Sequence, residues 1–335
     1  MQLRPLGRTG LRVPPICLGT MTFGLQCDEA TSFAILDRAF DGGIDFIDTA
    51  DVYPLGGDLT TAGRTEEIVG RWMRDRGNRD RIVLATKCAG RVGPGPNDGG
   101  LTRYHIQRAV EASLRRLGTD VIDLYQVHAF DPHVPVDQTL RALDDLVRAG
   151  KVRYIGCSNY PAWRLGQALS TSARLAISRY ETVQPRYNLL YRDIETELLP
   201  LCQSEGLGVI VYNPLAGGFL SGKYAKGTEP QEGTRFTLGN AARNYQQRYW
   251  NDPQFDAVAA LRSVADARGT RLAAVAVAWV LAQPGITSAI VGASKPAQLD
   301  DTLAAADLQL DDELARACDA AWWQLPRRRV VEGYR

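Results

Sequence analysis

The chain alternates short apolar runs with amphipathic stretches from residue 16 almost to its end, and this alternation constrains the fold most strongly. Five amphipathic stretches, 28–43, 64–77, 101–118, 135–150 and 193–206, end in glycine, as helix C-caps favour. The apolar runs have the length of buried strands and occupy residues 16–18, 44–47, 82–85, 121–127, 152–157, 182–184, 208–212 and 287–291. Eight strand–helix units without a change in composition predict a (β/α)8 TIM barrel, and we interpret residues 1–335 as one domain.

Three segments do not fit the alternation. Residues 1–13 resemble a β-hairpin with a Gly-Arg-Thr-Gly turn, placed to cap the N-terminal mouth of the barrel. Residues 217–250 form a long loop after the seventh strand, and residues 322–335 form an aromatic and basic tail. Loops of this length in a compact domain are usually functional or disordered, and the aromatic side chains favour function.

Composition excludes several classes of protein. The 335 residues are 45% hydrophobic and 23% charged with a net charge of +1, which indicates a soluble globular protein with no nucleic-acid or membrane partner. The basic run 327–329 is interpreted as a solvated tail or a local anion contact. Six cysteines without a C-x-x-C pair indicate reduced thiols. No secretory signal and no apolar run of about 18 residues is visible, so we predict a cytoplasmic protein.

A metal site is not predicted. The chain has three histidines, and His128 and His133 flank Asp131 in a way that could suggest ligands. Pro132 lies between them, however, and no second cluster of ligand residues exists, so the spacing does not match a metal site.

Polar residues follow consecutive predicted strands. In an α/β barrel the active site lies at the carboxyl ends of the strands. The polar residues at these ends are Asp48, Lys87, His128, Ser158, Asn159, Gln184, Tyr212, Asn213 and Ser294. Each of them alone has an ordinary interpretation as a solvated residue or a loop contact, but together they predict a ring of functional groups around one mouth.

The first three of these residues suggest acid–base chemistry. Asp48, Lys87 and His128 come from neighbouring strands, and Tyr53 lies on the loop above them. A nearby ammonium favours phenolate, and a carboxylate would hold that ammonium charged. Tyr53 could then give a proton to a carbonyl oxygen, with His128 as a hydrogen-bond donor to the same atom. The protein offers no hydride, so a cofactor must supply the redox chemistry.

At this point the sequence resembles the aldo-keto reductase superfamily, in its bacterial branch. The segments "GIDFIDTADVY", "LATK" and "LYQVH" resemble its catalytic motifs, and "VRYIGCSNY", "VQPRYNLLYR", "VYNPLAGGFLSGKY" and "IVGASKPAQLDD" resemble its cofactor motifs. The resemblance implies a (β/α)8 barrel that binds NADPH without a Rossmann fold. It also implies a catalytic tetrad of Asp48, Tyr53, Lys87 and His128 with Tyr53 as general acid. The absence of G-x-G-x-x-G agrees with this.

The resemblance also implies cofactor contacts. Ser158, Asn159 and Gln184 would bind the nicotinamide carboxamide, and Tyr212 would stack on the ring. The segment 213–223 would pass over the pyrophosphate, and the segment from Gly292 would hold the adenosine. The remaining implied contacts are Thr20, Asn213, Pro214, Leu215, Gly218, Leu220, Lys223, Gly292, Ser294, Lys295, Gln298 and Asp301. Family members often have an arginine within the "GAS" segment, where this chain has Ser294 and Lys295, and these two residues could still hold a 2′-phosphate. NADP is therefore the predicted cofactor and NAD the alternative.

The substrate side is suggested by loops and aromatic residues. Candidate pocket walls are Met21, Tyr245, Tyr249, Trp250, Trp322 and Trp323, with ordinary core packing as the alternative for each aromatic residue. The bacterial branch includes general aldehyde reductases and reductases of keto-deoxysugar nucleotides, and the sequence does not separate them. The partner is therefore a small-molecule carbonyl compound.

Two other functions remain open from sequence. Relatives of this fold serve as cofactor-binding auxiliary subunits of channels and still carry the tetrad. A barrel lyase that forms a Schiff base through Lys87 is the other alternative. The ring of residues suited to a nicotinamide argues against the lyase.

Overall fold

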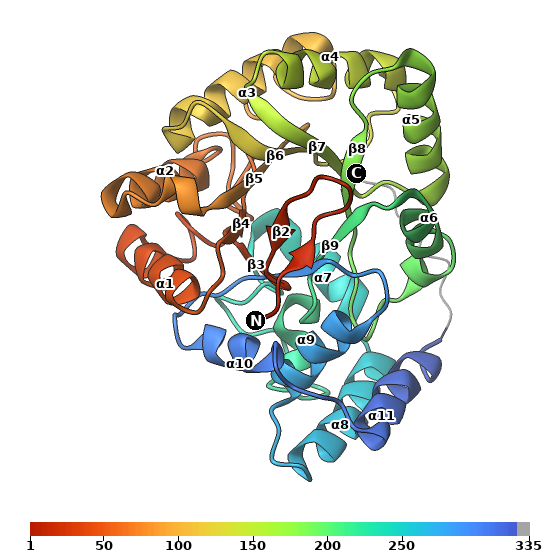
Figure 1. The fold of residues 1–335 in the computed structure, drawn as a ribbon. Helices are drawn as coiled ribbons and strands as arrows, with labels where there is room; N and C mark the ends of the chain where they lie inside the picture. Colours follow the sequence, from red (N-terminus) through yellow and green to blue (C-terminus); the bar gives the residue numbers. More distant parts are fainter. Residues whose placement is uncertain (327–335) are drawn as a thin grey trace.

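The eight predicted strands pair in parallel and close into a barrel in the order β10-β3-β4-β5-β6-β7-β8-β9 (Figure 1). This computed structural model describes residues 1–326. The barrel strands are β3 (Ile16–Gly19), β4 (Phe46–Asp48), β5 (Val83–Cys88), β6 (Ile122–Val127), β7 (Val152–Ser158), β8 (Tyr180–Gln184), β9 (Gly208–Tyr212) and β10 (Ser288–Val291). The (β/α)8 prediction is confirmed, because each strand overlaps its predicted run and its bounds differ by no more than three residues, the largest difference being the end of β5.

Helices surround the barrel, as the amphipathic stretches predicted (Figure 1). The α-helices are α1 (Glu29–Asp41), α2 (Arg64–Arg76), α3 (Arg103–Leu117), α4 (Val136–Arg148), α5 (Ala162–Leu175), α6 (Leu198–Glu205), α7 (Ala242–Tyr249), α8 (Asp252–Asp266), α9 (Leu272–Ala282), α10 (Gln298–Ala305) and α11 (Asp312–Trp323). Short 3-10 segments are η1 (Arg79–Arg81), η2 (Asp193–Glu195), η3 (Ala216–Ser221) and η4 (Gly239–Ala241). Gly77 and Gly118 end α2 and α3 in the left-handed conformation, at φ 58° and 62°, which glycine adopts without steric cost.

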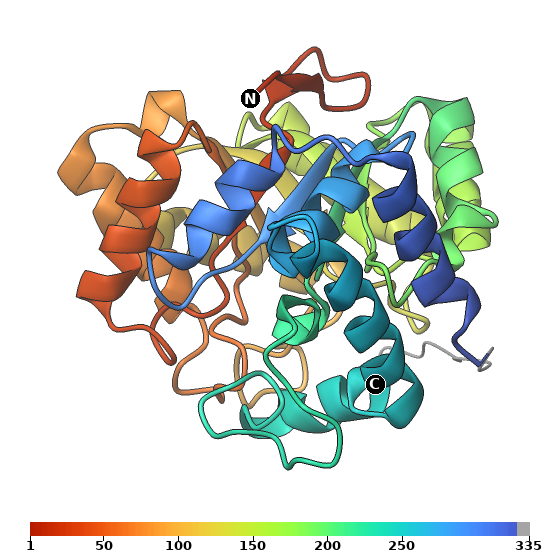
Figure 2. The ribbon, with the colours of Figure 1, turned by 90° about the horizontal axis from the view of Figure 1, so that it is seen from below.

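The predicted N-terminal hairpin is confirmed. Strands β1 (Arg4–Pro5) and β2 (Arg12–Val13) pair antiparallel. Leu6 and Val13 are fully buried in a cluster with inward-facing side chains of six barrel strands, including Phe46 and Leu124. The hairpin therefore closes the N-terminal mouth with apolar contacts, and Figure 2 shows it at the opposite end of the molecule from the insert 217–250. The ligand-binding end must be the other one.

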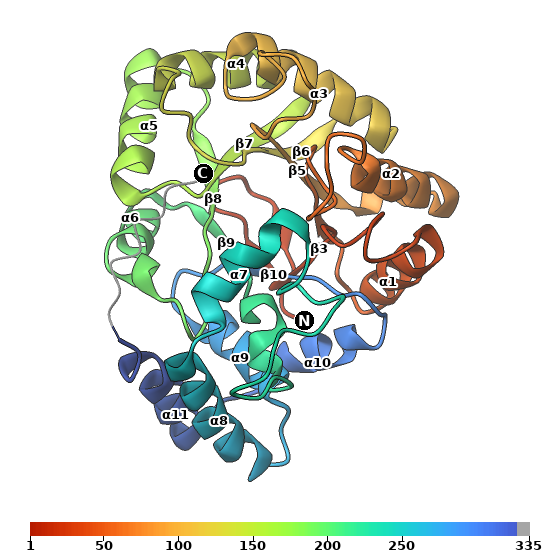
Figure 3. The ribbon, with the colours of Figure 1, turned by 180° about the vertical axis from the view of Figure 1, so that it is seen from behind.

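The insert after β9 is not a plain loop, because it contains most of η3, all of η4 and the helix α7. Figure 3 shows α7 lying across the carboxyl-terminal mouth of the barrel. Tyr245 and Tyr249, four residues apart on α7, are both buried, and this apolar spacing is what makes the segment helical. The insert is tied to the loop after β3 by Gln26 Nε2, which donates to the Gly233 carbonyl at 3.1 Å.

Part of the predicted C-terminal tail is helical. Trp322 and Trp323 end α11, whereas residues 327–335, including the basic run 327–329, lie outside the described residues. Across residues 1–326, no helix combines the length and apolar character that crossing a membrane requires.

Candidate active site

The four predicted catalytic side chains lie together at the ends of β4, β5 and β6. Lys87 Nζ donates to Asp48 Oδ1 at 2.5 Å and to the Thr49 carbonyl at 2.9 Å. The same Nζ lies 5.1 Å from the centre of the Tyr53 ring. Tyr53 and His128 meet edge to face, with ring centres 5.8 Å apart. The parallel register explains the cluster, since β4, β5 and β6 are consecutive neighbours in the barrel.

The Asp48–Lys87 pair is fully enclosed, since Asp48 is 2% exposed and Lys87 0%. A buried carboxylate needs further donors, and two amides provide them. Gln126 Nε2 donates to Asp48 Oδ2 at 3.2 Å and Gln184 Nε2 to the same oxygen at 2.8 Å. Gln126 was not predicted, because it stands inside the strand β6 rather than at its end. These contacts fix the Asp48 carboxylate and through it the Lys87 ammonium.

Two backbone hydrogen bonds hold His128 in place. Its backbone N–H donates to the Cys88 carbonyl at 2.7 Å, and its backbone carbonyl accepts from Asn159 Nδ2 at 3.0 Å. Burial, together with the charge of Lys87, lowers the pKa of His128 to about 3. The imidazole is therefore neutral at physiological pH and can act as a hydrogen-bond donor rather than an acid.

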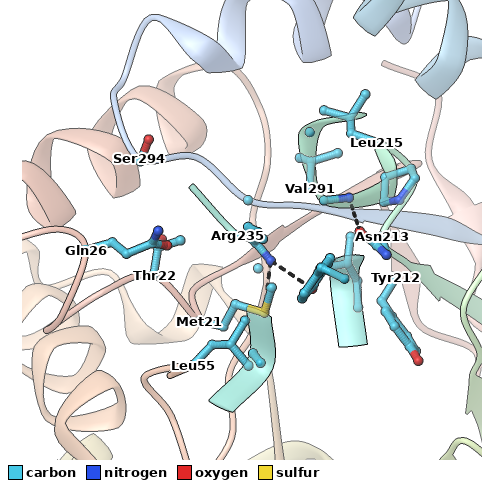
Figure 4. Close-up of a pocket in the computed structure, with 18 of the residues that line it drawn as sticks. Met21, Thr22, Gln26, Leu55, Tyr212, Asn213, Leu215, Arg235, Val291 and Ser294 are labelled. Carbon is cyan, nitrogen blue, oxygen red and sulfur yellow. Dashed lines mark hydrogen bonds between the residues drawn. The ribbon is translucent and has the colours of Figure 1, made fainter. Parts of the chain in front are cut away.

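A cavity of about 860 Å³ opens above the tetrad and runs over the end of β10 to helices α9 and α10. That size suits a dinucleotide with a small substrate. Most of the predicted residues line it: Thr20, Met21, Asp48, Tyr53, His128, Ser158, Asn159, Gln184, Tyr212, Asn213, Pro214, Leu215, Gly218, Lys223, Tyr245, Gly292, Ser294, Gln298 and Asp301. Figure 4 shows some of them, with Tyr212 and Asn213 on one side and Ser294 on the other.

Several predicted contact residues lie outside the cavity lining. Lys87 is beneath it, behind Asp48. Leu220 is fully buried, and Lys295 is on the surface. Four of the predicted pocket aromatics are also outside, namely Tyr249, Trp250, Trp322 and Trp323, and the last of these is 63% exposed.

Three of these four aromatic residues pack against other side chains instead of lining the pocket. The Tyr249 hydroxyl is occupied by the side-chain amides of Asn188 and Asn213, at 3.1 and 2.9 Å. Trp250 joins an aromatic cluster, and its ring centre is 4.8 Å from that of Phe236. Trp322 packs against the core from α11. Core packing, the alternative interpretation for these residues, describes their position.

Arg235, on the insert, lines the cavity and was missed by the sequence analysis. Its Nη1 lies 3.4 Å from Met21 Sδ and 3.4 Å from the Tyr245 hydroxyl. Figure 4 shows it reaching toward Met21. A Cβ added to Gly292 would come within 3.3 Å of Arg235 Nη2, so the guanidinium closely approaches the end of β10. No pattern in the insert marks this arginine, because only tertiary folding brings residues 19–24 and 292–294 to it.

Asn213 lines the cavity and also has a local structural role. Its Oδ1 accepts from the Gly217 N–H at 2.6 Å, and its Nδ2 donates to Tyr249. Gly217 and Gly218 have φ of 71° and 91°. A Cβ on Gly217 would approach the Tyr245 ring to 2.6 Å, so glycine is needed there. Asn213 thus shapes the turn that lines the cavity.

Asp51 provides a prediction on stability. It is buried behind the tetrad, and neither of its carboxylate oxygens meets a donor with good geometry. Burial, with the nearby charge of Glu66, holds the pKa of Asp51 well above its usual range, against Arg116 and Lys87, which lower it. The folded state therefore keeps a proton that the unfolded chain releases above pH 3.8, so stability falls as pH rises beyond that value.

We expect Asp51→Asn to raise the free energy of unfolding at pH 7 by roughly 1–3 kcal/mol and to flatten its decline between pH 5 and 8. Urea unfolding across this range measures both. A gain that is the same at every pH, or a loss, would contradict the prediction.

Within the described residues, no three His, Cys, Asp or Glu side chains lie together in a way that could hold a metal ion. A closed parallel barrel with Asp, Tyr, Lys and His at its carboxyl-terminal mouth, beneath a cavity of dinucleotide size, has the architecture of a barrel oxidoreductase.

Comparison with known proteins identifies the family. A model of the Aldo/keto reductase family matches residues 15–322. The chain is 42% identical to the "Uncharacterized oxidoreductase YrpG" of Bacillus subtilis (strain 168) over 94% of both chains. It is 38% identical to a "Probable voltage-gated potassium channel subunit beta" of Oryza sativa subsp. japonica over 100% of both. It is 33% identical to the "L-glyceraldehyde 3-phosphate reductase" of Escherichia coli (strain K12), over 91% of this chain and 87% of that one.

The chain belongs to the aldo/keto reductase family and is an NAD(P)H-dependent oxidoreductase.

Proposed function

We propose that the protein reduces an aldehyde or ketone to an alcohol with NADPH, and that Tyr53 is the general acid. The observation that carries the proposal is the position of the Tyr53 ring, which contacts both the Lys87 ammonium and the His128 ring at the floor of the cavity. An ammonium beside a phenol stabilises the phenolate that remains after proton transfer. A phenol in solution, with a pKa near 10, loses its proton too rarely at neutral pH for this task.

Each member of the tetrad has a role in this reaction. Asp48 pairs with the Lys87 ammonium at 2.5 Å, and an ammonium beside the Tyr53 ring favours its phenolate. Tyr53 transfers its proton to the substrate oxygen as negative charge develops there. Neutral His128 donates a hydrogen bond to the same oxygen, which orients the substrate and stabilises that charge.

The cavity fits a nicotinamide dinucleotide, which supplies the hydride when it is bound. Both donors of the Gln184 amide are directed at protein, to Asp48 Oδ2 at 2.8 Å and Gln126 Oε1 at 3.3 Å. Its Oε1 accepts no hydrogen bond from the described residues and can accept one from the nicotinamide carboxamide. Lys223 and Arg235 are two cations that line the cavity, and both could pair with a pyrophosphate.

Arg235 gives a prediction on cofactor affinity. We expect Arg235→Met to lower the affinities for NADPH and NADH alike, by about tenfold or more, because the substitution removes a charge-assisted contact to the pyrophosphate that both nucleotides share. Fluorescence titration with each nucleotide measures this. Lys226→Met is the matched control, since Lys226 is on the same insert, outside the cavity lining, and pairs with Asp256 at 2.8 Å. Equal affinities for wild type and Arg235→Met would contradict the proposed contact.

The proposed function is tested by NADPH oxidation at 340 nm with a panel of aldehydes and ketones. The panel includes a phosphorylated aldehyde, because one relative is named for such a substrate, and keto-deoxysugar nucleotides. Turnover of any member supports carbonyl reduction and begins to define the substrate. A cytoplasmic location remains a prediction.

A second candidate function is a cofactor-binding channel subunit, which the rice relative favours by aligning with the whole chain. Tight NADPH binding without turnover of any carbonyl compound would support it. Borohydride trapping of an imine at Lys87 would instead support the lyase alternative.

A further inference from the structure

Helices α9 and α10 line the end of the cavity that lies away from the tetrad. Ala273 of α9 and Gln298, Asp301 and Thr302 of α10 line it, with Ser294 of the preceding loop. If the nicotinamide lies at Tyr53, as proposed above, the adenosine ribose of the same molecule must reach this end. The charges here therefore decide which dinucleotide binds.

Asp301 is the carboxylate of this end, and it is paired with an arginine from the other helix. Arg271, which precedes the first residue of α9, places Nη1 3.1 Å from both Asp301 oxygens. The Arg271 side chain is 77% exposed and the Asp301 side chain 26% exposed. Asp301 lines the cavity, whereas Arg271 does not, so the pair stands at the rim with the guanidinium on its exposed side.

Asp301 and Arg271 favour different dinucleotides. A carboxylate near an adenosine ribose accepts from the 2′-hydroxyl of NAD and repels the 2′-phosphate of NADP, whereas a nearby arginine accommodates that phosphate. The contacts to Asp301 use Nη1, and Arg271 makes no hydrogen bond through Nε or Nη2 to the described residues. Arg271 can therefore neutralise Asp301 and still offer N–H groups to a phosphate.

The residues predicted from sequence for the 2′-phosphate fit this role less well. The Ser294 N–H donates to Gln298 Oε1 at 2.8 Å, and its hydroxyl lies 3.3 Å from the same atom. Lys295 is on the surface and, unlike Arg271, forms no ion pair among the described residues with a side chain that lines the cavity.

We infer that Arg271 is the specificity-determining residue for NADP, and that it binds the adenosine 2′-phosphate from helix α9 while holding Asp301. The inference rests on the proposed dinucleotide site.

Calorimetric titration with 2′-phospho-ADP-ribose and ADP-ribose tests the inference, because these probes lack the nicotinamide and differ only in the phosphate. Arg271→Met should lower the affinity for 2′-phospho-ADP-ribose by about 10- to 100-fold, as expected for a lost hydrogen bond between charged groups. The affinity of the same variant for ADP-ribose should change less than about threefold. Asp301→Asn should bind 2′-phospho-ADP-ribose at least as tightly as wild type does, and it should bind ADP-ribose more weakly.

The matched control is Arg38→Met. Arg38 pairs with Asp300, the neighbour of Asp301, at 2.7 Å, but neither lines the cavity. This variant should bind both probes as wild type does.

The outcomes separate the two proposals. If wild type binds neither probe nor NADPH, the dinucleotide site itself is wrong, and the inference falls with it. If wild type binds both probes, and Arg271→Met lowers the affinity for both equally or for neither, the dinucleotide site stands and Arg271 is not the determinant. Binding of 2′-phospho-ADP-ribose that does not weaken with added salt would also overturn the inference, since a guanidinium–phosphate contact at an exposed rim is screened.

Discussion

Replacing Tyr53 by phenylalanine is expected to lower carbonyl reduction by about 100- to 10,000-fold, the contribution of a positioned general acid. The ring would remain in contact with Lys87 and His128, because the substitution removes only the hydroxyl. The affinity for NADPH should therefore change less than about twofold. The loss should appear in kcat, since the proton is transferred in the transition state rather than in the ground state.

Two measurements decide this prediction, the steady-state rate at 340 nm and NADPH binding by fluorescence. Tyr104→Phe is the matched control, because Tyr104 is an exposed tyrosine on α3 outside the cavity, and it should retain full activity. Turnover by Tyr53→Phe at the wild-type rate would show that another group gives the proton. His128 is not expected to take over, because its pKa of about 3 leaves the ring neutral.

The barrel could be predicted because its signal is local and repeated. A parallel strand is buried on both faces, so each of the eight strands is recorded in the sequence as a short apolar run. The tetrad followed from the same rule, because consecutive strands of a barrel are neighbours and their ends share one mouth. Asp48, Lys87 and His128 could thus be placed together without any knowledge of distances.

The residues that sequence reasoning missed are those whose position depends on tertiary contacts. Arg235 belongs to an insert whose path over the mouth is set by contacts such as Gln26 with Gly233. Arg271 was missed because it meets Asp301, which was predicted, only across two helices and 30 residues of sequence. Gln126 lies inside a strand, where its inward direction follows from the barrel's geometry and not from its neighbours in sequence.

The aromatic residues show the opposite failure. Tyr249 and Trp250 were expected at the pocket because aromatics gather in the insert, but an aromatic side chain is equally suited to a core. The insert needs its own core to cross the mouth, and the cluster of Phe219, Phe236 and Trp250 provides it. Composition cannot separate these uses, whereas the position of each ring can.

Substitution of Lys87 by methionine is expected to cost about 3–5 kcal/mol of unfolding free energy, because it leaves the Asp48 carboxylate buried without a counter-charge. Gln126 and Gln184 would still donate to Asp48 Oδ2, but neutral amides cannot replace an ammonium at 2.5 Å. Activity should be lost as well, since no cation then favours the Tyr53 phenolate. Urea unfolding and the rate at 340 nm give the two quantities.

The double variant Asp48→Asn/Lys87→Met separates stability from chemistry. Removing both charges leaves no unpaired ion, so most of the stability lost in Lys87→Met should return. Activity should not return, because the ammonium beside Tyr53 is still absent. A double variant as unstable as Lys87→Met would mean that packing, not charge, sets the cost. A double variant that regains turnover would remove Lys87 from the mechanism. If stability alone returns, the buried pair is retained for its effect on Tyr53 and not for the stability of the barrel.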